Sequence, residues 1–178
     1  MPNIQSVILG GGCFWCTETL FKRLRGVVKV VPGYAGGHSP DPTYEQVCTG
    51  NTGHAEVIKI DFDSEQISFE TLLDVFFSVH DPTTPNRQGN DMGTQYRSII
   101  LFSDLEQEKT AQAKIARLTD EGIYRDQIVT ELKPLKKFYE AEEYHHDYFA
   151  KNPDKAYCQL VINPKLKKLK DKWKDLIK

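Results

Sequence analysis

The stretch HAEVIKIDFD, residues 54–63, alternates strictly between its two faces and so predicts a β-strand. One face of this strand carries Ala55, Val57 and Lys59. The other face carries Glu56, Ile58, Ile60 and Phe62. The last three are core-type residues, which places Glu56 at the end of a row that points into the protein.

Helix and strand patterns flank this strand on both sides. Hydrophobic periodicity and turn residues predict, in chain order, a strand over 6–10, a helix over 17–26, strands over 27–37 and 54–63, a helix over 68–81 and a strand over 96–102. This β-α-β, β-α-β order is typical of the ferredoxin-like split βαβ fold, an α+β two-layer sheet with helices on one face.

Further elements are expected toward the C-terminus. The pattern predicts a long helix over 103–122, a strand over 128–132, a short helix over 142–153, a strand-like segment over 156–162 and an amphipathic helix over 164–178. No repeat, low-complexity tract or linker interrupts the sequence. We therefore expect a single catalytic domain over residues 1–178.

Two long irregular loops stand apart from this scheme. Residues 33–53 and 81–95 are rich in Gly, Pro, Asn and Thr and nearly empty of aliphatic side chains. Loops of this length in a compact domain are usually functional or disordered. Because firm strands or helices flank both of them, we expect them to carry functional residues.

The composition excludes several classes of function. With 178 residues, 39% of them hydrophobic, and a net charge of −2, the chain can bury a core but has no overall charge for nucleic acid or an acidic membrane surface. No stretch approaches the ~18 apolar residues of a membrane helix, and no signal peptide is recognisable. We therefore expect a cytoplasmic monomer, in which four cysteines indicate thiol chemistry or metal binding rather than structural disulfides.

The stretch GGGCFWCTE, residues 10–18, carries two of these cysteines. Cys13 stands between a predicted strand and a predicted helix, where its thiol would lie over unpaired backbone N–H groups. That environment is expected to lower the thiol pKa from ~8.5 toward neutrality and to make Cys13 a thiolate nucleophile. Cys16 follows three residues later, with Cα atoms about 5–6 Å apart, a separation that a disulfide can close.

Four interpretations of this cysteine pair compete. A zinc site needs about four ligands, and no second Cys or His pair stands at ligand spacing. A thioredoxin-like dithiol has this spacing, but the chain lacks the expected order of parallel strands. A structural disulfide does not suit a reducing compartment. A nucleophilic cysteine fits best, with Phe14 and Trp15 as walls for a small apolar group, although two core aromatics would give the same pattern.

Side chains far along the sequence could complete such a site. Glu56, at the inner end of its row, would have a raised pKa and donate a proton at neutral pH, unless it is a solvated acid at a strand end. Tyr44 and Tyr96 border the two long loops and could donate hydrogen bonds to a substrate oxygen. Asp91 could orient a water or a side chain, or cap a turn.

Several segments together resemble the signature segments of the peptide methionine sulfoxide reductase A family. They are GGCFWCTE, GYAGG, YEQVCTGNTGHAEV and HDPTTPNRQGNDMGTQYRSIILF, while AEEYHHDYFAKNP and AYCQLVINPKLKKL resemble its C-terminal part. The likeness spans nearly the whole chain and the segments fall in the same order, which makes it specific. The resemblance implies a ferredoxin-like α+β fold with irregular extensions.

The resemblance also implies a chemistry and a role for each candidate residue. Cys13 would attack the sulfur of methionine-S-sulfoxide, free or within an oxidised protein, and Glu56 would donate the proton. The remaining positions would be Phe14 and Trp15 for the substrate methyl group, Tyr44 and Tyr96 for the sulfoxide oxygen, and Asp91 for the pocket wall. A sulfenic acid would form on Cys13, condense with a second cysteine and be regenerated by thioredoxin, without a cofactor or a metal.

Two cysteines could act as the second cysteine of this cycle. Many members of the family carry glycine in place of Cys16 and use C-terminal cysteines, whereas this chain has both Cys16 and Cys158. We expect Cys16 to react first because of its spacing, with Cys158 as a relay or a core residue. Cys48 is interpreted as a small buried hydrophobic residue.

Two other functions compete with sulfoxide reduction. One is a general dithiol oxidoreductase that acts on protein disulfides, and the other is a non-catalytic module that captures oxidised methionine in an aromatic pocket. The presence of both Cys13 and Glu56 favours catalysis over capture.

Overall fold

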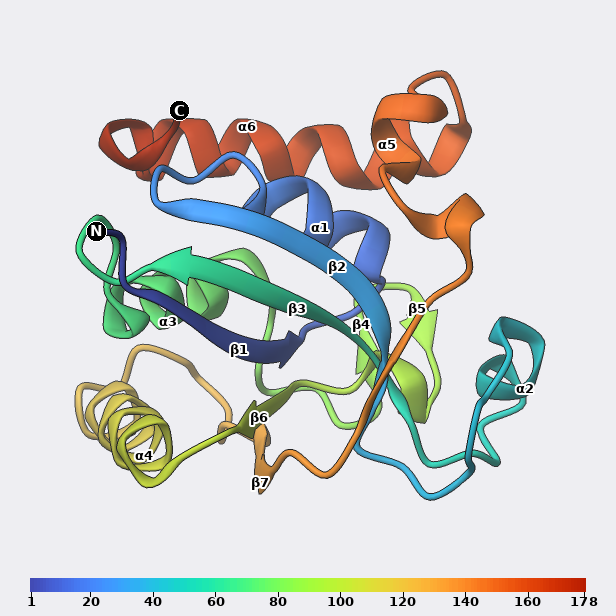
Figure 1. The fold of residues 1–178 in the computed structure, drawn as a ribbon, viewed down its shortest axis with the longest axis horizontal. Coiled ribbons are helices and arrows are strands. Elements are labelled where there is room, and N and C mark those ends of the chain that lie inside the picture. The colour runs from blue at the N-terminus through green and yellow to red at the C-terminus, as the bar shows by residue number, and fades with distance from the viewer.

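A six-stranded sheet forms the centre of the computed structural model, which describes residues 1–178 (Figure 1). Its strands are β1 (Ile4–Gly10), β2 (Val27–Ala35), β3 (Ala55–Asp63), β6 (Ile99–Phe102), β7 (Glu131–Pro134) and β8 (Phe138–Glu140). They lie in the order β7-β6-β1-β3-β2-β8. All neighbours are antiparallel except β6 and β7, which run parallel. The expected mixed α+β class is confirmed.

Helices cover the sheet and fill the connections. They are α1 (Phe14–Phe21), α2 (Tyr44–Cys48), α3 (Phe69–Val79), α4 (Leu105–Asp120), α5 (Tyr148–Lys151) and α6 (Asn163–Lys172). The hydroxyl of Ser68 and the carboxylate of Asp104 accept backbone N–H groups at the starts of α3 and α4, so both predicted helix starts are confirmed. None of the helices is both long enough and apolar enough to cross a membrane.

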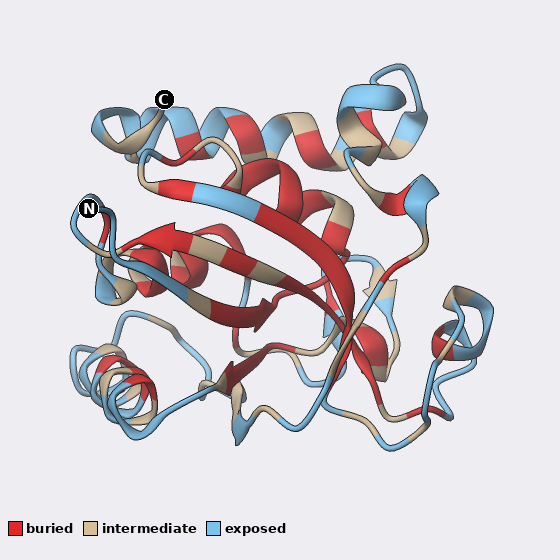
Figure 2. Cartoon of the chain, in the orientation of Figure 1, coloured by how far each residue is buried: buried red, intermediate tan, exposed pale blue.

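The alternation predicted for residues 54–63 is confirmed in β3. Ile58, Ile60 and Phe62 belong to a cluster of 29 buried residues that also includes side chains of α1, α3, α4 and α6. Ala55 and Val57 belong to a separate cluster of six buried residues. Figure 2 shows the buried residues concentrated along α1 and the central strands. One face of β3 therefore packs against the helices, and Glu56 lies on that face.

The two long irregular segments contain short elements of their own. Residues 33–53 include α2, and residues 81–95 include the hairpin of β4 (Arg87–Gln88) and β5 (Asp91–Met92) and most of a 3-10 turn over Thr94–Tyr96. The guanidinium of Arg97 donates to the carbonyl oxygens of Gly53, at 2.8 Å, and of Thr94, at 2.9 Å. Arg97 thus fastens the second segment to the first beside the start of β3.

The strand predicted over 156–162 is wrong. Cys158–Ile162 instead form a π-helical turn that runs directly into α6. A 3-10 turn over residues 143–145 and the short helix α5 precede it in the chain. Cys158 and Ile162 are buried while the residues between them are more exposed, a spacing of four that suits a helix and not a strand. The apolar content of this segment was visible in the sequence, but its period was misread.

Several element ends also differ from the prediction. The first helix begins at Phe14 and not at residue 17, because Cys13 already acts as its N-cap. The strand predicted over 96–102 starts at Ile99, because Tyr96 belongs to the 3-10 turn. The strand predicted over 128–132 lies at 131–134, the helix over 142–153 is reduced to a turn and α5, and the last helix ends at Lys172. The short strand β8 was not predicted.

Candidate active site

Cys13 is held by a glycine turn between β1 and α1. A Cβ atom at Gly10 would lie 2.9 Å from the carbonyl oxygen of Glu56, and Gly12 has a φ of +93°, so both positions require glycine. Cys13 follows with an extended backbone at the N-cap of α1 and is only 7% exposed. The turn therefore brings the start of α1 close to the end of β3 that carries Glu56.

Glu56 reaches from β3 to the start of α1. It is 1% exposed, and its Oε1 accepts the backbone N–H of Phe14 at 3.2 Å. Its Oε2 is buried and has no hydrogen-bond partner. Burial raises the pKa of the Glu56 carboxyl to about 8, against the opposing effect of the Phe14 N–H. At neutral pH this carboxyl is therefore largely protonated, as expected, and the unpartnered Oε2 is free to hold the proton.

The expected lowering of the Cys13 pKa is wrong for the substrate-free protein. Burial raises the pKa of the Cys13 thiol well above its usual value, and the charges of Glu56 and Cys16 raise it further. Hydrogen bonds from Trp15 and Tyr157 only partly oppose this effect. The N-terminus of one helix does not compensate for the loss of water around a buried sulfur.

Tyr44 and Tyr96 both respond to the charge of Glu56. Burial and then the charge of Glu56 raise the pKa of each phenol, so both hydroxyls stay protonated at neutral pH and can donate hydrogen bonds. The backbone of Tyr44 is fixed by its N–H, which donates to Glu142 Oε2 at 2.8 Å. Glu142 Oε1 in turn accepts the hydroxyl of Tyr34 at 2.8 Å. The two predicted tyrosines thus lie near the predicted acid although they come from different loops.

Phe14 and Trp15 are surrounded by other aromatic rings. Trp15 stacks on Tyr148 with ring centroids 3.7 Å apart and planes within 6°, and its edge meets Tyr157 at 5.7 Å. Phe14 is buried, with its ring 5.0 Å from the imidazole of His145. These contacts fix both rings in the first turn of α1, directly after Cys13.

Asp91 reaches the cysteine pair through a residue that the sequence analysis missed. The hydroxyl of Tyr157 donates to Asp91 Oδ2 at 2.6 Å and lies 3.7 Å from the sulfur of Cys16. Burial, followed by the charges of Cys13 and Cys16, raises the pKa of Tyr157. Asp91 therefore orients a tyrosine beside both cysteines. The signal for Tyr157 was its place next to Cys158 in the segment AYCQLVI.

His145 is a second functional candidate that the sequence analysis missed. It is 0% exposed, and its Nδ1 accepts the indole N–H of Trp15 at 3.0 Å. The imidazole is therefore neutral at Nδ1, and its buried Nε2, which carries the hydrogen, has no partner. Burial lowers the pKa of His145, in agreement with the neutral form.

The other two cysteines lie in contrasting places. Cys158 is 0% exposed and packs in the same cluster as Cys16, and burial raises its pKa. Cys48 is exposed, so its interpretation as a buried residue is wrong. Cys48 ends the short helix α2, which lies within the irregular segment 33–53 and has Val47 as its only buried residue. All four cysteines are free thiols in the structure.

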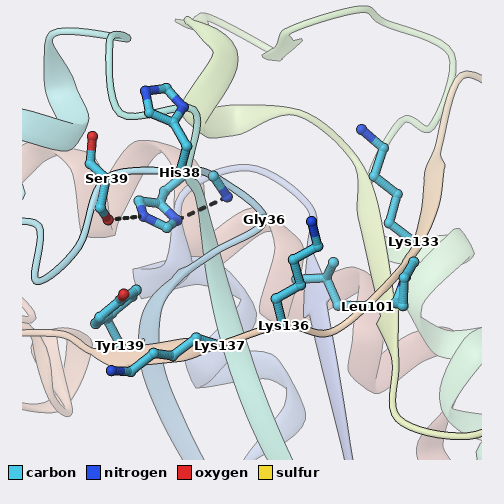
Figure 3. A pocket seen from close by; sticks show the side chains of 11 residues that line it. Gly36, His38, Ser39, Leu101, Lys133, Lys136, Lys137 and Tyr139 are labelled. Carbon is cyan, nitrogen blue, oxygen red and sulfur yellow. Dashed lines mark hydrogen bonds between the residues drawn. The ribbon is translucent and has the colours of Figure 1, made fainter.

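No group of three or more His, Cys, Asp or Glu side chains gathers in a way that could hold a metal ion. A separate cleft of about 450 Å³ lies away from the cysteines and contains none of the candidate catalytic residues (Figure 3). It is lined by Lys133, Lys136 and Lys137 on one side and by His38 and Ser39 on the other. His54, at its edge, ties Gly37 and Ser39 together through its two ring nitrogens.

A buried cysteine at the start of a helix, facing a protonated carboxyl and two phenol donors and followed by a second thiol, defines a thiol-dependent oxidoreductase. The family model described as "Peptide methionine sulfoxide reductase" matches residues 5–177. The chain belongs to the peptide methionine sulfoxide reductase family.

Known proteins agree in sequence and in fold. The relative named "Peptide methionine sulfoxide reductase MsrA" from Saccharolobus solfataricus is 57% identical over 175 residues, which cover 98% of either chain. The crystal structure of Mxr1 from Saccharomyces cerevisiae in its reduced form has a TM-score of 0.80 and 36% identity, and covers 87% of this chain and 89% of that one. Mxr1 in complex with Trx2 has a TM-score of 0.56 and 23% identity over 82% of this chain and 84% of that one, a likeness of fold.

Proposed function

We propose that this chain reduces methionine-S-sulfoxide, free or within peptides, to methionine by attack of Cys13 on sulfur. The observation that carries the proposal is Glu56, a buried carboxyl with a pKa of about 8 whose Oε1 is bound by the Phe14 N–H while its Oε2 has no partner. A sulfoxide oxygen must gain a proton before the S–O bond breaks. A neutral acid beside a nucleophilic sulfur supplies what that reaction needs.

The substrate is positioned by the residues around Cys13. Phe14 and Trp15 hold the methyl group against their fixed rings, and the hydroxyls of Tyr44 and Tyr96 donate to the sulfoxide oxygen. The oxygen then lies where Glu56 Oε2 can protonate it. Asp91 acts through Tyr157, whose hydroxyl it fixes beside the cysteines.

The chemical step moves two electrons from Cys13 to the substrate. The Cys13 sulfur attacks the sulfoxide sulfur, Glu56 protonates the oxygen, and the thiol proton of Cys13 returns to the Glu56 carboxylate. The oxygen passes to the Cys13 sulfur, so methionine leaves and a sulfenic acid remains. The thiol of Cys16 then attacks the sulfenic sulfur, which expels water and forms a disulfide.

The resolving cysteine can be identified by mass spectrometry. One equivalent of sulfoxide, added without reductant, is expected to give a Cys13–Cys16 disulfide, because the N–H of Cys16 already bonds to the carbonyl oxygen of Cys13 at 3.1 Å. Cys158 lies buried in a helical turn and would have to move before it could react. Cys16→Ser is expected to release one methionine per chain and then stop. A Cys13–Cys158 bond that forms without a Cys13–Cys16 precursor would contradict this order.

A dithiol protein reopens the disulfide, and thioredoxin is our proposed reductant. Mxr1, a structural neighbour, has been solved in complex with Trx2, which supports a reductant of this kind. The four free thiols support a reducing, cytoplasmic setting. A monomeric state stays a prediction.

The finer description of the fold belongs to the same proposal. The strand order β6-β1-β3-β2, with α1 between β1 and β2 and α3 between β3 and β6, supports a ferredoxin-like fold. The large buried cluster, which includes side chains from four helices, supports helices on one face. That cluster runs from Val7 to Leu169, which supports one catalytic domain over residues 1–178.

The decisive test of function compares the two epimers of methionine sulfoxide. With thioredoxin, its reductase and NADPH, we expect NADPH to be consumed with the S epimer and not with the R epimer. Turnover of the R epimer alone would contradict the proposal. Reduction of insulin disulfides with no response to sulfoxides would favour a general dithiol oxidoreductase, and stoichiometric binding without turnover would favour a capture module.

The pH dependence of the Cys13 thiol is a separate prediction. In the substrate-free protein, Cys13 is expected to titrate above an ordinary thiol because of burial and the Glu56 charge. Glu56→Gln removes that charge and should move the titration to lower pH, while burial keeps it above the ordinary value. The measurement is the Cβ chemical shift of carbon-labelled cysteine followed with pH. Cys158, whose pKa is raised by burial alone, is the internal control that should not move.

A further inference from the structure

A basic groove of about 600 Å³ lies between α6 and the C-terminal end of α3. Its positive charges are Arg125, Lys165, Lys168 and Lys172, and its negative charges are Asp81 and Asp126. The three lysines stand three and four residues apart on α6 and so share one helix face. Because the whole chain has a net charge of −2, this excess of positive charge is local.

The floor of this groove touches the glycine turn that holds Cys13. Two of the buried residues that line the groove contact this turn: the ring of His80 would lie 3.1 Å from a Cβ at Gly11, and the side chain of Gln88 closes on Gly12. The amide of Gln88 also bonds to both backbone groups of Asp81, at 3.0 and 2.9 Å. The groove and the nucleophile are thus separated by a single layer of residues.

The groove also adjoins the second and third sulfurs. The turn over Cys158–Ile162 runs directly into α6, and α6 packs against α1, which carries Cys16 (Figure 1). Burial raises the pKa of the Cys16 thiol, and the positive charge of Lys165 on α6 opposes that rise. In the same turn, Leu160 is 76% exposed next to the buried Cys158.

These sulfurs are buried, so a protein that reduces them must bind closely before its thiol can attack. A small dithiol can diffuse to the disulfide without any docking surface. A protein reductant instead needs apolar contact near the disulfide and gains speed from opposite charge around it. Leu160 offers the apolar contact, and the lysine face of α6 offers the charge.

We propose that this groove, lined by Arg125, Lys165, Lys168 and Lys172, is the docking surface for the dithiol protein that reduces the enzyme, and that it fits a reductant with carboxylates around its reactive thiol. The inference rests on the proposed reduction cycle and adds to it the place and the charge of the partner.

The test is a charge reversal on α6 with two reductants. Lys168→Glu/Lys172→Glu leaves Lys165 in place because the charge of that residue acts on the pKa of Cys16. With an acidic thioredoxin at low ionic strength and saturating methionine-S-sulfoxide, the variant is expected to lose roughly tenfold in kcat/KM for thioredoxin. The loss should shrink as salt is added, because salt screens exposed charges. With dithiothreitol, turnover should be unchanged.

A matched control comes from the other basic cleft. Lys133→Glu/Lys136→Glu, on the cleft of Figure 3, changes the net charge by the same amount but away from the cysteines, and should leave thioredoxin kinetics unaltered. Lys172 lies 5.4 Å above the ring of Trp173, so reversing its charge could disturb the fold as well as the groove. The milder Lys168→Gln/Lys172→Gln variant tests for this: it should show a smaller loss of kcat/KM for thioredoxin and the same dependence on salt.

Several outcomes would overturn the inference. Three of them are unchanged thioredoxin kinetics in the Lys168→Glu/Lys172→Glu variant, an equal loss with dithiothreitol, and an equal loss in the Lys133→Glu/Lys136→Glu control. A fourth is a KM that rises for an oxidised acidic peptide and not for thioredoxin, which would make the groove a substrate site. Failure of the unsubstituted protein to turn over with dithiothreitol would contradict the proposed function itself.

Discussion

Cys13→Ser is expected to abolish sulfoxide reduction, with a loss of at least roughly 10⁴-fold in kcat, because a hydroxyl cannot take up the sulfoxide oxygen as a sulfenic acid does. The fold should persist, since serine fills nearly the same volume at the N-cap of α1. The measurement is methionine formed in a single turnover from the S epimer, which needs neither resolution nor a reductant.

Cys48→Ser is the matched control for this variant. It makes the same atomic change on the exposed helix α2 and should leave the single-turnover rate unaltered. Methionine formation by Cys13→Ser at a rate near that of the unsubstituted protein would mean that another sulfur attacks the substrate, and the assignment of Cys13 would be lost.

Glu56→Gln is expected to lower the rate of the first step by about 10²–10⁴-fold, the range associated with loss of a general acid. The amide keeps an oxygen for the Phe14 N–H and places an NH₂ group where Oε2 lies, so binding geometry is preserved while proton transfer is not. The effect should fall on the rate constant of methionine formation more than on substrate affinity. Single-turnover kinetics at several sulfoxide concentrations separate the two.

Glu18→Gln provides the comparison for Glu56→Gln. Glu18, which lies one turn further along α1 than Phe14, is also a buried carboxyl with a raised pKa and an unpartnered oxygen. Its other oxygen accepts the backbone N–H of Asp147. Its substitution should change stability without changing the chemical step. If the two variants lose activity to the same degree, Glu56 supports the structure and is not the proton donor.

Local patterns along the sequence predicted much of the fold. The strict alternation of residues 54–63 fixed both the existence of β3 and the inward direction of Glu56, because side chains on a strand alternate between faces without regard to the rest of the chain. Polar residues, Ser68 in one segment and Ser103 or Asp104 in the other, likewise located the starts of α3 and α4 to within one residue, and the structure has Ser68 and Asp104 as the caps. The misread segment 156–162 shows the limit: a short apolar run has the same composition in a strand and in a helical turn.

The candidate site was predicted in part for the same reason. Motif residues such as Cys13 and Glu56 carry their chemistry in their type and local spacing. The roles of Tyr157 and His145 depend on contacts. The hydroxyl of Tyr157 lies between Asp91 and Cys16, and the imidazole of His145 accepts the indole N–H of Trp15. Neither contact leaves a periodic signal, because the partners are separated by more than sixty residues of chain.

By itself, the sequence determined the α+β class and the order of the central elements, since these follow from hydrophobic period and caps, while the roles proposed for Cys13 and Glu56 came from residue chemistry together with the family resemblance. Only the tertiary structure decided the protonation of Cys13, whose pKa the sequence predicted to be lowered, whereas the raised pKa of Glu56 was predicted. Closing the sheet and helices around Cys13 removes water from the thiol and the carboxyl, and this burial raises both pKa values against the effect of the helix N-terminus. Desolvation depends on everything packed around a group, which no stretch of neighbouring residues can report.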